Sequence, residues 1–256
     1  MIINPYIFAP SVDPDAQAFI TAASITDPTQ QAAINTLVVD LKGYSIWTKF
    51  KAIYPIVGGV ASSHAVNLKT PGTYNLSFQT GWTHSSTGMT PNGATFANTF
   101  LAPSTNLSLN STHISGYIRT NAVSHAPILS SENAGSYDNG LYIWSLQNQG
   151  LYSVRVNDNT SDFGTVTYDI RGLHLATRTG ANVKKYRVNT TQIFNSTTTS
   201  SALNTSSIYI GASRNNANYY SNQIAFSSIG DGLTDTEAAN FYTAVQAFQT
   251  TLNRQV

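Results

Sequence analysis

The chain has 256 residues, of which only 10% are charged, and its formal net charge at pH 7 is +1. A chain of this length can bury roughly three quarters of its unfolded surface, so its core needs no disulfide or metal. Cysteine is absent, which excludes thiolate metal sites, thiol nucleophiles and a disulfide framework. A nucleic-acid binder carries a basic surplus on one face, so this charge balance argues against nucleic acid as a partner.

The polar residues are mainly Ser, Thr, Asn and Gln, which form hydrogen bonds without carrying charge. Such a surface suits carbohydrate, or close packing in a large assembly, better than a charged ligand. The opening segment MIINPYIFAP has no basic start and no long apolar run, so we expect no signal peptide. No stretch approaches the roughly 20 apolar residues of a membrane span, and we expect no membrane insertion.

The first 60 residues have helical spacing. Asp13 and Asp27 are capping acids, and each precedes a proline that fits the first helical turn. Ser45 can cap a third, shorter helix. The predicted helices cover Pro14–Ala22, Pro28–Lys42 and Ile46–Ile53. We therefore interpret residues 15–60 as a helical segment that packs on the rest of the chain, and residues 1–14 as an N-terminal arm.

From about residue 61 the pattern changes to the two-residue period of β-strands. The predicted strands are Tyr74–Thr80, Thr95–Leu101, Thr112–Thr120, Leu141–Gln147, Leu151–Asn157, Thr165–Ile170, Gly172–Arg178, Val183–Asn189, Ser207–Gly211 and Gln223–Ile229. Turn-forming residues such as Asn, Asp and Gly separate them. Many short strands with turns at this spacing predict a β-sandwich or barrel.

The last third of the chain closes with a strand and a helix. The apolar run Ile224–Gly230 ends at Gly-Asp-Gly, and a helical pattern follows at once. Thr234 can cap this helix and Glu237, three residues later, can return the bond, which is the spacing of a capping box. The sequence therefore predicts a sandwich over residues 61–256 that is closed by a helix over residues 234–252.

Several short motifs follow one another in this region at a regular order and spacing. They are His174-Leu175-Ala176, Tyr186-Arg187-Val188-Asn189, Ile208-Tyr209-Ile210-Gly211, Gln223-Ile224-Ala225-Phe226 and Leu233-Thr234-Asp235-Thr236-Glu237. Their order resembles that of the concanavalin A-like and laminin-G-like jelly-roll superfamily. The resemblance implies a mainly β fold, an antiparallel jelly-roll sandwich with a short N-terminal helical region and a C-terminal helix.

A second resemblance covers most of residues 15–256. The segments Leu37–Gly59 and Gly81–Gly93, with the C-terminal segment, are similar to a jelly-roll module of virion proteins from tailed bacteriophages. This resemblance implies a virion structural protein of a tail fibre, a head fibre or a capsid-associated appendage, assembled in the host cytoplasm. Its partners would be other virion subunits, its first 14 residues a virion anchor, and its lectin-like domain could bind host surface polysaccharide during adsorption.

Fibres and spikes are commonly trimers, so by analogy we expect a homo-oligomer and name a trimer as one form. The alternative is a free polysaccharide-binding or polysaccharide-degrading protein of the same fold. That protein would be expected to carry an export signal, and its degrading form a pair of catalytic carboxylates.

The acidic residues argue against glycoside hydrolysis. Glycosidases place two carboxylates roughly 5 Å apart, or roughly 6.5–9.5 Å apart, across the scissile bond. The chain has two glutamates: Glu237 is assigned to the helix cap, and Glu132 lies in a predicted loop. Asp158 and Asp162 flank a turn, which leaves their separation open. We expect no enzymatic activity from a carboxylate pair.

A polysaccharide lyase could instead use His or Tyr as its base, with Arg to neutralise a uronate. His113, Tyr117 and Arg119 alternate along one predicted strand and so share a face. The simpler interpretation is a sheet tyrosine beside a capping histidine, and we name no catalytic residue.

Two turns could offer oxygen ligands to Ca²⁺. One contains Asp138 and Asn139, and the other contains Asp158, Asn159 and Asp162. Polar residues in a turn more often only form the turn, so we expect no metal or other cofactor.

The nearest approach to a basic cluster is the run VKKYRVN. On a strand Lys185 and Arg187 share a face, while Lys184 points the other way. We interpret this run as a solvated strand edge, because edge lysines discourage strand-on-strand aggregation.

Sugar sites combine an aromatic face with a few amide or hydroxyl groups, so aromatic residues in polar loops are the candidates. The candidate ligand-binding residues are Trp82, His84, Tyr137, Asn215, Tyr219 and Tyr220. Packing at a sheet edge or against a neighbouring subunit is the alternative for Trp82 and the two adjacent tyrosines. Trp144 lies in the middle of a strand with Tyr142 on its face, and we interpret it as core.

Overall fold

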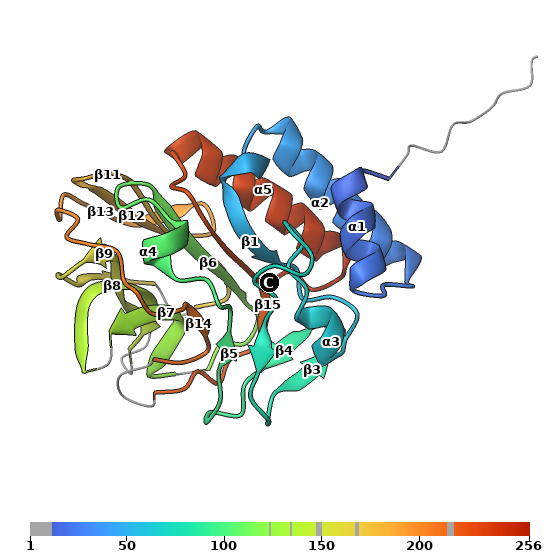
Figure 1. The fold of residues 1–256 in the computed structure, drawn as a ribbon, viewed down its shortest axis with the longest axis horizontal. Coiled ribbons are helices and arrows are strands. Elements are labelled where there is room, and N and C mark those ends of the chain that lie inside the picture. The colour runs from blue at the N-terminus through green and yellow to red at the C-terminus, as the bar shows by residue number, and fades with distance from the viewer. Residues whose placement is uncertain (1–11, 123, 134, 147–149, 167–168, 214–217) are drawn as a thin grey trace, which may run out of the picture.

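The computed structural model describes residues 12–122, 124–133, 135–146, 150–166, 169–213 and 218–256. Its helices are α1 (Pro14–Ala22), α2 (Pro28–Gly43), α3 (Ala61–His64), α4 (Pro103–Asn106) and α5 (Asp235–Thr251), with a 3₁₀ turn η1 (Trp47–Lys49). Two antiparallel sheets pack face to face, and α1, α2 and α5 lie together on the far side of one of them (Figure 1). No helix in the described part of the chain is long and apolar enough to cross a membrane.

We call the sheet beneath the helices sheet A and its partner sheet B. Sheet A contains β1 (Phe50–Tyr54), β3 (Thr83–Ser85), β4 (Gly88–Thr90), β6 (Thr112–Ile118), β11 (Gly172–Gly180), β12 (Val183–Val188), β13 (Thr191–Ser196) and β15 (Ile224–Gly230). Sheet B contains β2 (Ser77–Phe78), β5 (Ala97–Asn98), β7 (Ala126–Asn133), β8 (Ser136–Ser145), β9 (Leu151–Asp158), β10 (Asp162–Thr165) and β14 (Tyr209–Ile210).

The strand order shows long crossovers between the sheets. Sheet A runs β13-β12-β11-β6-β15-β4-β3, with β1 also paired to β15, and sheet B runs β10-β9-β8-β7-β14-β5-β2. Strands far apart in sequence are therefore neighbours, as β6 is to β15 and β7 to β14. This confirms the predicted fold class, a mainly β antiparallel jelly-roll sandwich with an N-terminal helical region and a C-terminal helix.

Two hydrophobic cores result from the three layers. One lies between the sheets and contains Ile114 of β6 and Ile143 of β8. The other lies between sheet A and the helices and contains Phe226 of β15 and Phe241 of α5. Because sheet A is covered on both faces, every residue of β6 and β15 is buried.

The predicted N-terminal caps of α1, α2 and α5 are confirmed, whereas the predicted Ser45 cap is wrong because η1 begins after Ile46 without a side-chain cap. The side chain of Asp13 accepts a hydrogen bond from the Asp15 amide, and Asp27 accepts one from the Gln30 amide. At α5, Thr234 and Glu237 form the capping box: the Thr234 amide donates to Glu237 Oε2 at 2.8 Å, and the Glu237 amide donates back to Thr234 Oγ1 at 3.4 Å.

The predicted third helix over Ile46–Ile53 is wrong. After η1 the chain enters β1, which pairs antiparallel with β15. Phe50 and Ile53 face the helices, whereas Ala52 and Tyr54 belong to the core between the sheets. A short apolar run suits either a helix or a fully buried strand, and here the free edge of β15 decides the outcome. The segment 15–60 therefore contributes a strand as well as helices.

Strand prediction fails where strands are short or polar. The strand predicted over Thr165–Ile170 is wrong, because β10 ends at Thr165 and the described residues 166 and 169–170 lie outside any strand. The strands β3, β4, β7 and β13 are not predicted from the sequence. Pairing with neighbouring strands, as β7 pairs with β8 and β13 pairs with β12, defines these strands more than local pattern does.

Two histidines are fully buried in sheet A. His113 Nδ1 donates to the Asp231 carbonyl at 2.6 Å, and His174 Nε2 donates to the Ile170 carbonyl at 2.7 Å. A carbonyl can only accept, so these bonds fix which nitrogen carries the proton in each neutral ring. Burial lowers the pKa of both imidazoles from 6.5 to about 4.

These depressed pKa values predict a loss of stability in mild acid. Between pH 6.5 and about 4 the unfolded chain binds protons that the folded chain excludes, so the free energy of unfolding falls as the pH falls. A shift of this size corresponds to about 3 kcal/mol for each histidine when fully expressed. Urea unfolding of the wild type at pH 4.5, 5.5, 6.5 and 7.5 should show this decline, and His113→Gln should show a shallower one. Equal pH slopes for the two proteins would contradict the assignment.

Candidate functional site

The outer face of sheet B, on the side away from sheet A, carries a row of aromatic and polar side chains. Leu141 and Ile143 of β8 belong to the core between the sheets, so Tyr142 and Trp144 point to the opposite face. On β9 the same alternation places Arg155 on this face, opposite Tyr142 in the register. Neither Tyr142 nor Trp144 belongs to either hydrophobic core.

Trp144 is the centre of a cluster of rings. Tyr137 and Tyr142 each lie 5.7 Å from it between ring centroids in edge-to-face geometry, and His125 lies 6.3 Å away. These neighbours leave only 6% of Trp144 exposed. Its indole Nε1 is buried without a hydrogen-bond partner. A buried donor without an acceptor is costly, and in a native structure it calls for an explanation such as a bound water molecule or local strain.

Arg155 joins the rings to the polar part of the face. Its guanidinium lies 5.7 Å from the centroid of the Tyr142 ring, and its Nε donates to Ser161 Oγ at 3.1 Å. It also donates to the Tyr137 carbonyl, which holds that segment over Trp144. Gly140 makes this possible, because an added Cβ there would lie 2.9 Å from Arg155 Cδ.

The tyrosine hydroxyls of this face stay protonated at neutral pH. Burial raises the pKa of Tyr142, and burial followed by the negative charge of Glu132 raises the pKa of Tyr137. Tyr142 shares a hydrogen bond of 2.9 Å with Ser161. Glu132, fully buried, accepts a hydrogen bond from Ser213 Oγ at 2.7 Å. The face therefore combines neutral hydroxyl groups with two accessible rings, the half-buried Tyr137 and the exposed Phe163.

Phe163 extends this face to the edge of the sheet. It lies on β10 opposite Ser153, which in turn lies opposite Trp144. The position of Gly164 fixes the direction of Phe163, because a Cβ on Gly164 would meet Ile193 of sheet A. Phe163 points the other way and is 60% exposed. We call Tyr137, Tyr142, Trp144, Arg155 and Phe163 the outer-face cluster.

The residues proposed from the sequence do not form one site. Tyr137 belongs to the outer-face cluster. Trp82 and His84 lie elsewhere, around Phe78, at ring distances of 5.3 and 4.7 Å. Trp82 is half-buried against the core between the sheets, and its Nε1 is buried without a partner. His84 Nδ1 lies 2.9 Å from Nδ1 of His64.

The remaining candidates lie near a segment of which only part is described. Tyr219 is half-buried and forms an isolated β-bridge with Ala212. The interpretation of Tyr220 as an exposed loop residue is wrong, because its side chain is 0% exposed within the core between the sheets. Asn215 lies outside the described residues. Trp144 is buried as expected, but it faces away from both cores, and only the pairing of its strand shows this.

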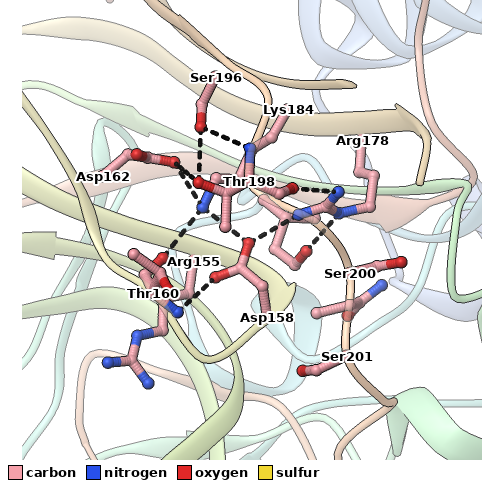
Figure 2. A network of polar contacts seen from close by, with 12 residues as sticks. Arg155, Asp158, Thr160, Asp162, Arg178, Lys184, Ser196, Thr198, Ser200 and Ser201 are labelled. Atoms are coloured by element: carbon pink, nitrogen blue, oxygen red, sulfur yellow. Dashed lines mark hydrogen bonds and ion pairs between the residues drawn. The ribbon is translucent and has the colours of Figure 1, made fainter. Parts of the chain in front are cut away.

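The charged residues near β9 form a buried network rather than a calcium site. The Asp158 carboxylate lies between Arg178 and Lys184, with Asp162 on the far side of the lysine (Figure 2). Lys184 Nζ is 2.7 Å from Asp158 Oδ2 and 2.7 Å from Asp162 Oδ2. Burial alone would raise the pKa of Asp162, but the hydrogen bond from Lys184 holds it below its usual value.

One expectation is corrected by this network: the run VKKYRVN is not a solvated strand edge, because β12 lies between β11 and β13 and Lys184 is fully buried. The carboxylate oxygens of Asp158 and Asp162 are paired with ammonium and guanidinium groups and are not free to bind Ca²⁺. In the described part of the chain, no group of three or more acidic or histidine residues is placed to hold a metal ion.

The lyase-like row is buried as well. His113 and Tyr117 are 0% exposed on β6, beneath α5. The Tyr117 hydroxyl donates to Gln246 of that helix at 3.1 Å, and Arg119 donates to the Arg254 carbonyl at 2.8 Å. These residues share a face, as their spacing indicates, but that face packs against the helix layer.

Several solved structures share this fold. A Trypanosoma rangeli sialidase in complex with 2,3-difluoro-KDN has a TM-score of 0.55 and 9% identity, over 83% of this chain and 39% of that one. The binding domain of botulinum neurotoxin DC, in complex with rat synaptotagmin II, has a TM-score of 0.53 and 13% identity, over 78% of this chain and 53% of that one. The binding domain of Paraclostridial Mosquitocidal Protein 1 has a TM-score of 0.52, 13% identity, and coverages of 77% and 52%.

This chain therefore spans between about two fifths and about half of the length of these structures, and the likeness shows a common fold. No family model matches the chain, and no curated protein matches it. The chain is an antiparallel β-sandwich of the jelly-roll type with a helix layer on sheet A.

The buried network predicts unequal roles for two adjacent lysines. Lys184→Met leaves Asp162 without its cation and Asp158 with Arg178 alone, so we expect a loss of about 3 kcal/mol in the free energy of unfolding. Lys185 pairs with Asp235, which is 58% exposed, so Lys185→Met should cost about 0–1 kcal/mol. Urea unfolding of the two variants at pH 7.5 measures the difference, and similar losses would contradict the buried ion network.

Proposed function

We propose that this chain is a carbohydrate-binding module and that its ligand, a polysaccharide, binds on the outer face of sheet B. The observation that carries the proposal is the outer-face cluster, in which the half-buried ring of Tyr137 and the exposed ring of Phe163 lie outside both cores, near the hydroxyl groups of Tyr142 and Ser161. Ligand sites combine apolar and aromatic walls with a few convergent polar groups, and this face has that composition.

The surrounding chemistry favours an uncharged or weakly charged ligand. Two of the hydroxyls near the rings belong to Tyr142 and Ser161, which are neutral at physiological pH. The single guanidinium of Arg155 already donates to Ser161 and to the Tyr137 carbonyl. The fold supports the proposal more weakly: one structure that shares it is a sialidase bound to a sugar derivative.

We propose binding without catalysis. The Lys184 ammonium group lies between the carboxylates of Asp158 and Asp162 and forms an ion pair with each of them. A glycosidase needs one carboxyl that can donate a proton and a second that is free to act as nucleophile or base. Glu132 is fully buried and accepts a hydrogen bond from Ser213.

The binding proposal predicts a selective effect of one exposed ring. A ring contact of this kind contributes about 0.5–1.5 kcal/mol, so Phe163→Ala should raise the dissociation constant about 3- to 10-fold. Phe100 is a matched control, because it is 59% exposed, close to the 60% of Phe163, and lies beyond β5 toward the other edge of sheet B.

The measurement is affinity electrophoresis or calorimetry against a panel of purified bacterial capsular polysaccharides and O-antigen chains. Phe100→Ala should bind like the wild type. A wild-type chain that binds none of the panel, or equal affinities for the Phe163 and Phe100 variants, would contradict the assignment of this face.

We further propose that the module serves in the virion of a tailed bacteriophage, as part of a tail fibre, head fibre or capsid-associated appendage. The resemblance of Leu37–Gly59 and Gly81–Gly93 supports this role, and the low charge of the chain suits repeated packing among subunits. Other virion subunits, and further copies of this chain in an assembly such as a trimer, would then be its partners.

Antibody labelling of purified virions tests this role. Gold particles at one defined place on the virion are expected, and their position would identify the appendage. Unlabelled virions, together with release of reducing sugar from capsule by the purified chain, would instead favour a free polysaccharide-degrading protein.

A further inference from the structure

A pocket of 480 Å³ lies beside the edge of sheet B, outside the outer-face cluster. This volume falls within the range of about 300–1,000 Å³ that is usual for small-molecule sites. The residues that line it are Thr165, Val166, Asp169, Val188, Asn189, Thr190, Thr191, Ile193 and Tyr242. They come from the end of β10, the segment after it, the turn between β12 and β13, and α5.

The polar groups of the pocket are mostly neutral. Threonine hydroxyls and the Asn189 amide stand beside the apolar side chains of Val166 and Ile193 and the ring of Tyr242. The acidic group, Asp169, is neutralised by a two-bond ion pair in which Arg171 donates at 2.7 and 2.9 Å. Hydroxyl and amide groups beside an aromatic ring match an uncharged sugar residue better than an anionic one.

The turn that forms one wall of the pocket is fixed in place. Asn189 adopts a positive φ of 54°, and its side-chain Oδ1 accepts a hydrogen bond from the Leu173 amide at 2.8 Å. Gly172 leaves room for this amide, because an added Cβ would lie 2.2 Å from Asn189 Oδ1. The wall is therefore preformed, which lowers the entropic cost of binding.

The edge strand β10 connects the pocket to the outer-face cluster. Phe163 and Thr165 are two residues apart on this strand, so their side chains lie on the same face, about 6.5–7 Å apart along the chain. Phe163 is the exposed end of the cluster, and Thr165 lines the pocket. A ligand that covers Phe163 and continues along the strand would reach the pocket.

We propose that the pocket is a second subsite of the same carbohydrate site and that the ligand is a neutral polymer long enough to reach from the outer-face cluster into it. The inference rests on the proposed function, since it extends that ligand across the edge of sheet B. The inference adds two requirements for the ligand. The polysaccharide must be long enough to span both places, and its sugar residue nearest Thr165 must be uncharged.

Substitutions that fill the pocket test this inference. Thr190 and Thr165 are exposed and lie on different walls, so Thr190→Trp and Thr165→Trp should occupy the space without disturbing a core. Thr36→Trp is the matched control, since Thr36 is an exposed threonine on α2 that does not line the pocket. Thermal unfolding confirms that each variant is folded.

The readout is the affinity for a size series of oligosaccharides prepared from a neutral polysaccharide that the wild type binds. For the wild type, affinity should rise with chain length. Both pocket variants should lose about 3- to 10-fold in affinity for the long members and keep the affinity for the shortest one, whereas Phe163→Ala should weaken all of them. Pocket variants that match Thr36→Trp at every length would overturn the second subsite and leave the outer-face site intact. Absence of wild-type binding to every polysaccharide would overturn the proposed function itself.

Discussion

The covering of sheet A on both faces is the constraint on which the rest of this structure depends. Sheet B covers one face and the helices α1, α2 and α5 cover the other, so β6 and β15 are buried along their whole length. Polar side chains on these strands are consequently buried, as those of His113 and Tyr117 are. Sheet B has no comparable helix layer in the described structure (Figure 1). Its outer face carries the rings that belong to neither core.

The buried ions show how a chain with few charges uses them. Lys184 lies between two carboxylates from sheet B, and Arg178 donates to Asp158 and to the backbone carbonyls of Val156, Gly180, Ala181 and Thr198 (Figure 2). Such a network contributes little net stability relative to an apolar core, but removing one partner lowers the free energy of unfolding strongly, because a charge is then left buried without its counter-ion. It joins β9 and the start of β10 to β11 and β12, and so fixes the edge strand on which Phe163 lies.

Local signals in the sequence are sufficient for the three long helices α1, α2 and α5 and for their caps, but not for the segment Ile46–Ile53 or the short helices α3 and α4. Asp13, Asp27 and Thr234 accept the hydrogen bonds that their positions predict, because capping depends on residues three or four positions away. Long-range pairing was not readable in this way: β1 is a strand because β15 has a free edge, and Lys184 is buried because carboxylates from another sheet reach it. The direction in which Trp144 points depends on the same kind of long-range pairing. The local pattern around Trp144 therefore predicts core, whereas the pairing of β8 places the residue on the outer face beside Tyr137.

A crystal structure of the chain with a bound oligosaccharide tests the central claim most directly. The sugar rings should lie on the outer face of sheet B, against Tyr137 and Phe163. Sugar bound around Trp82 and His84, with the outer face of sheet B empty, would contradict the account.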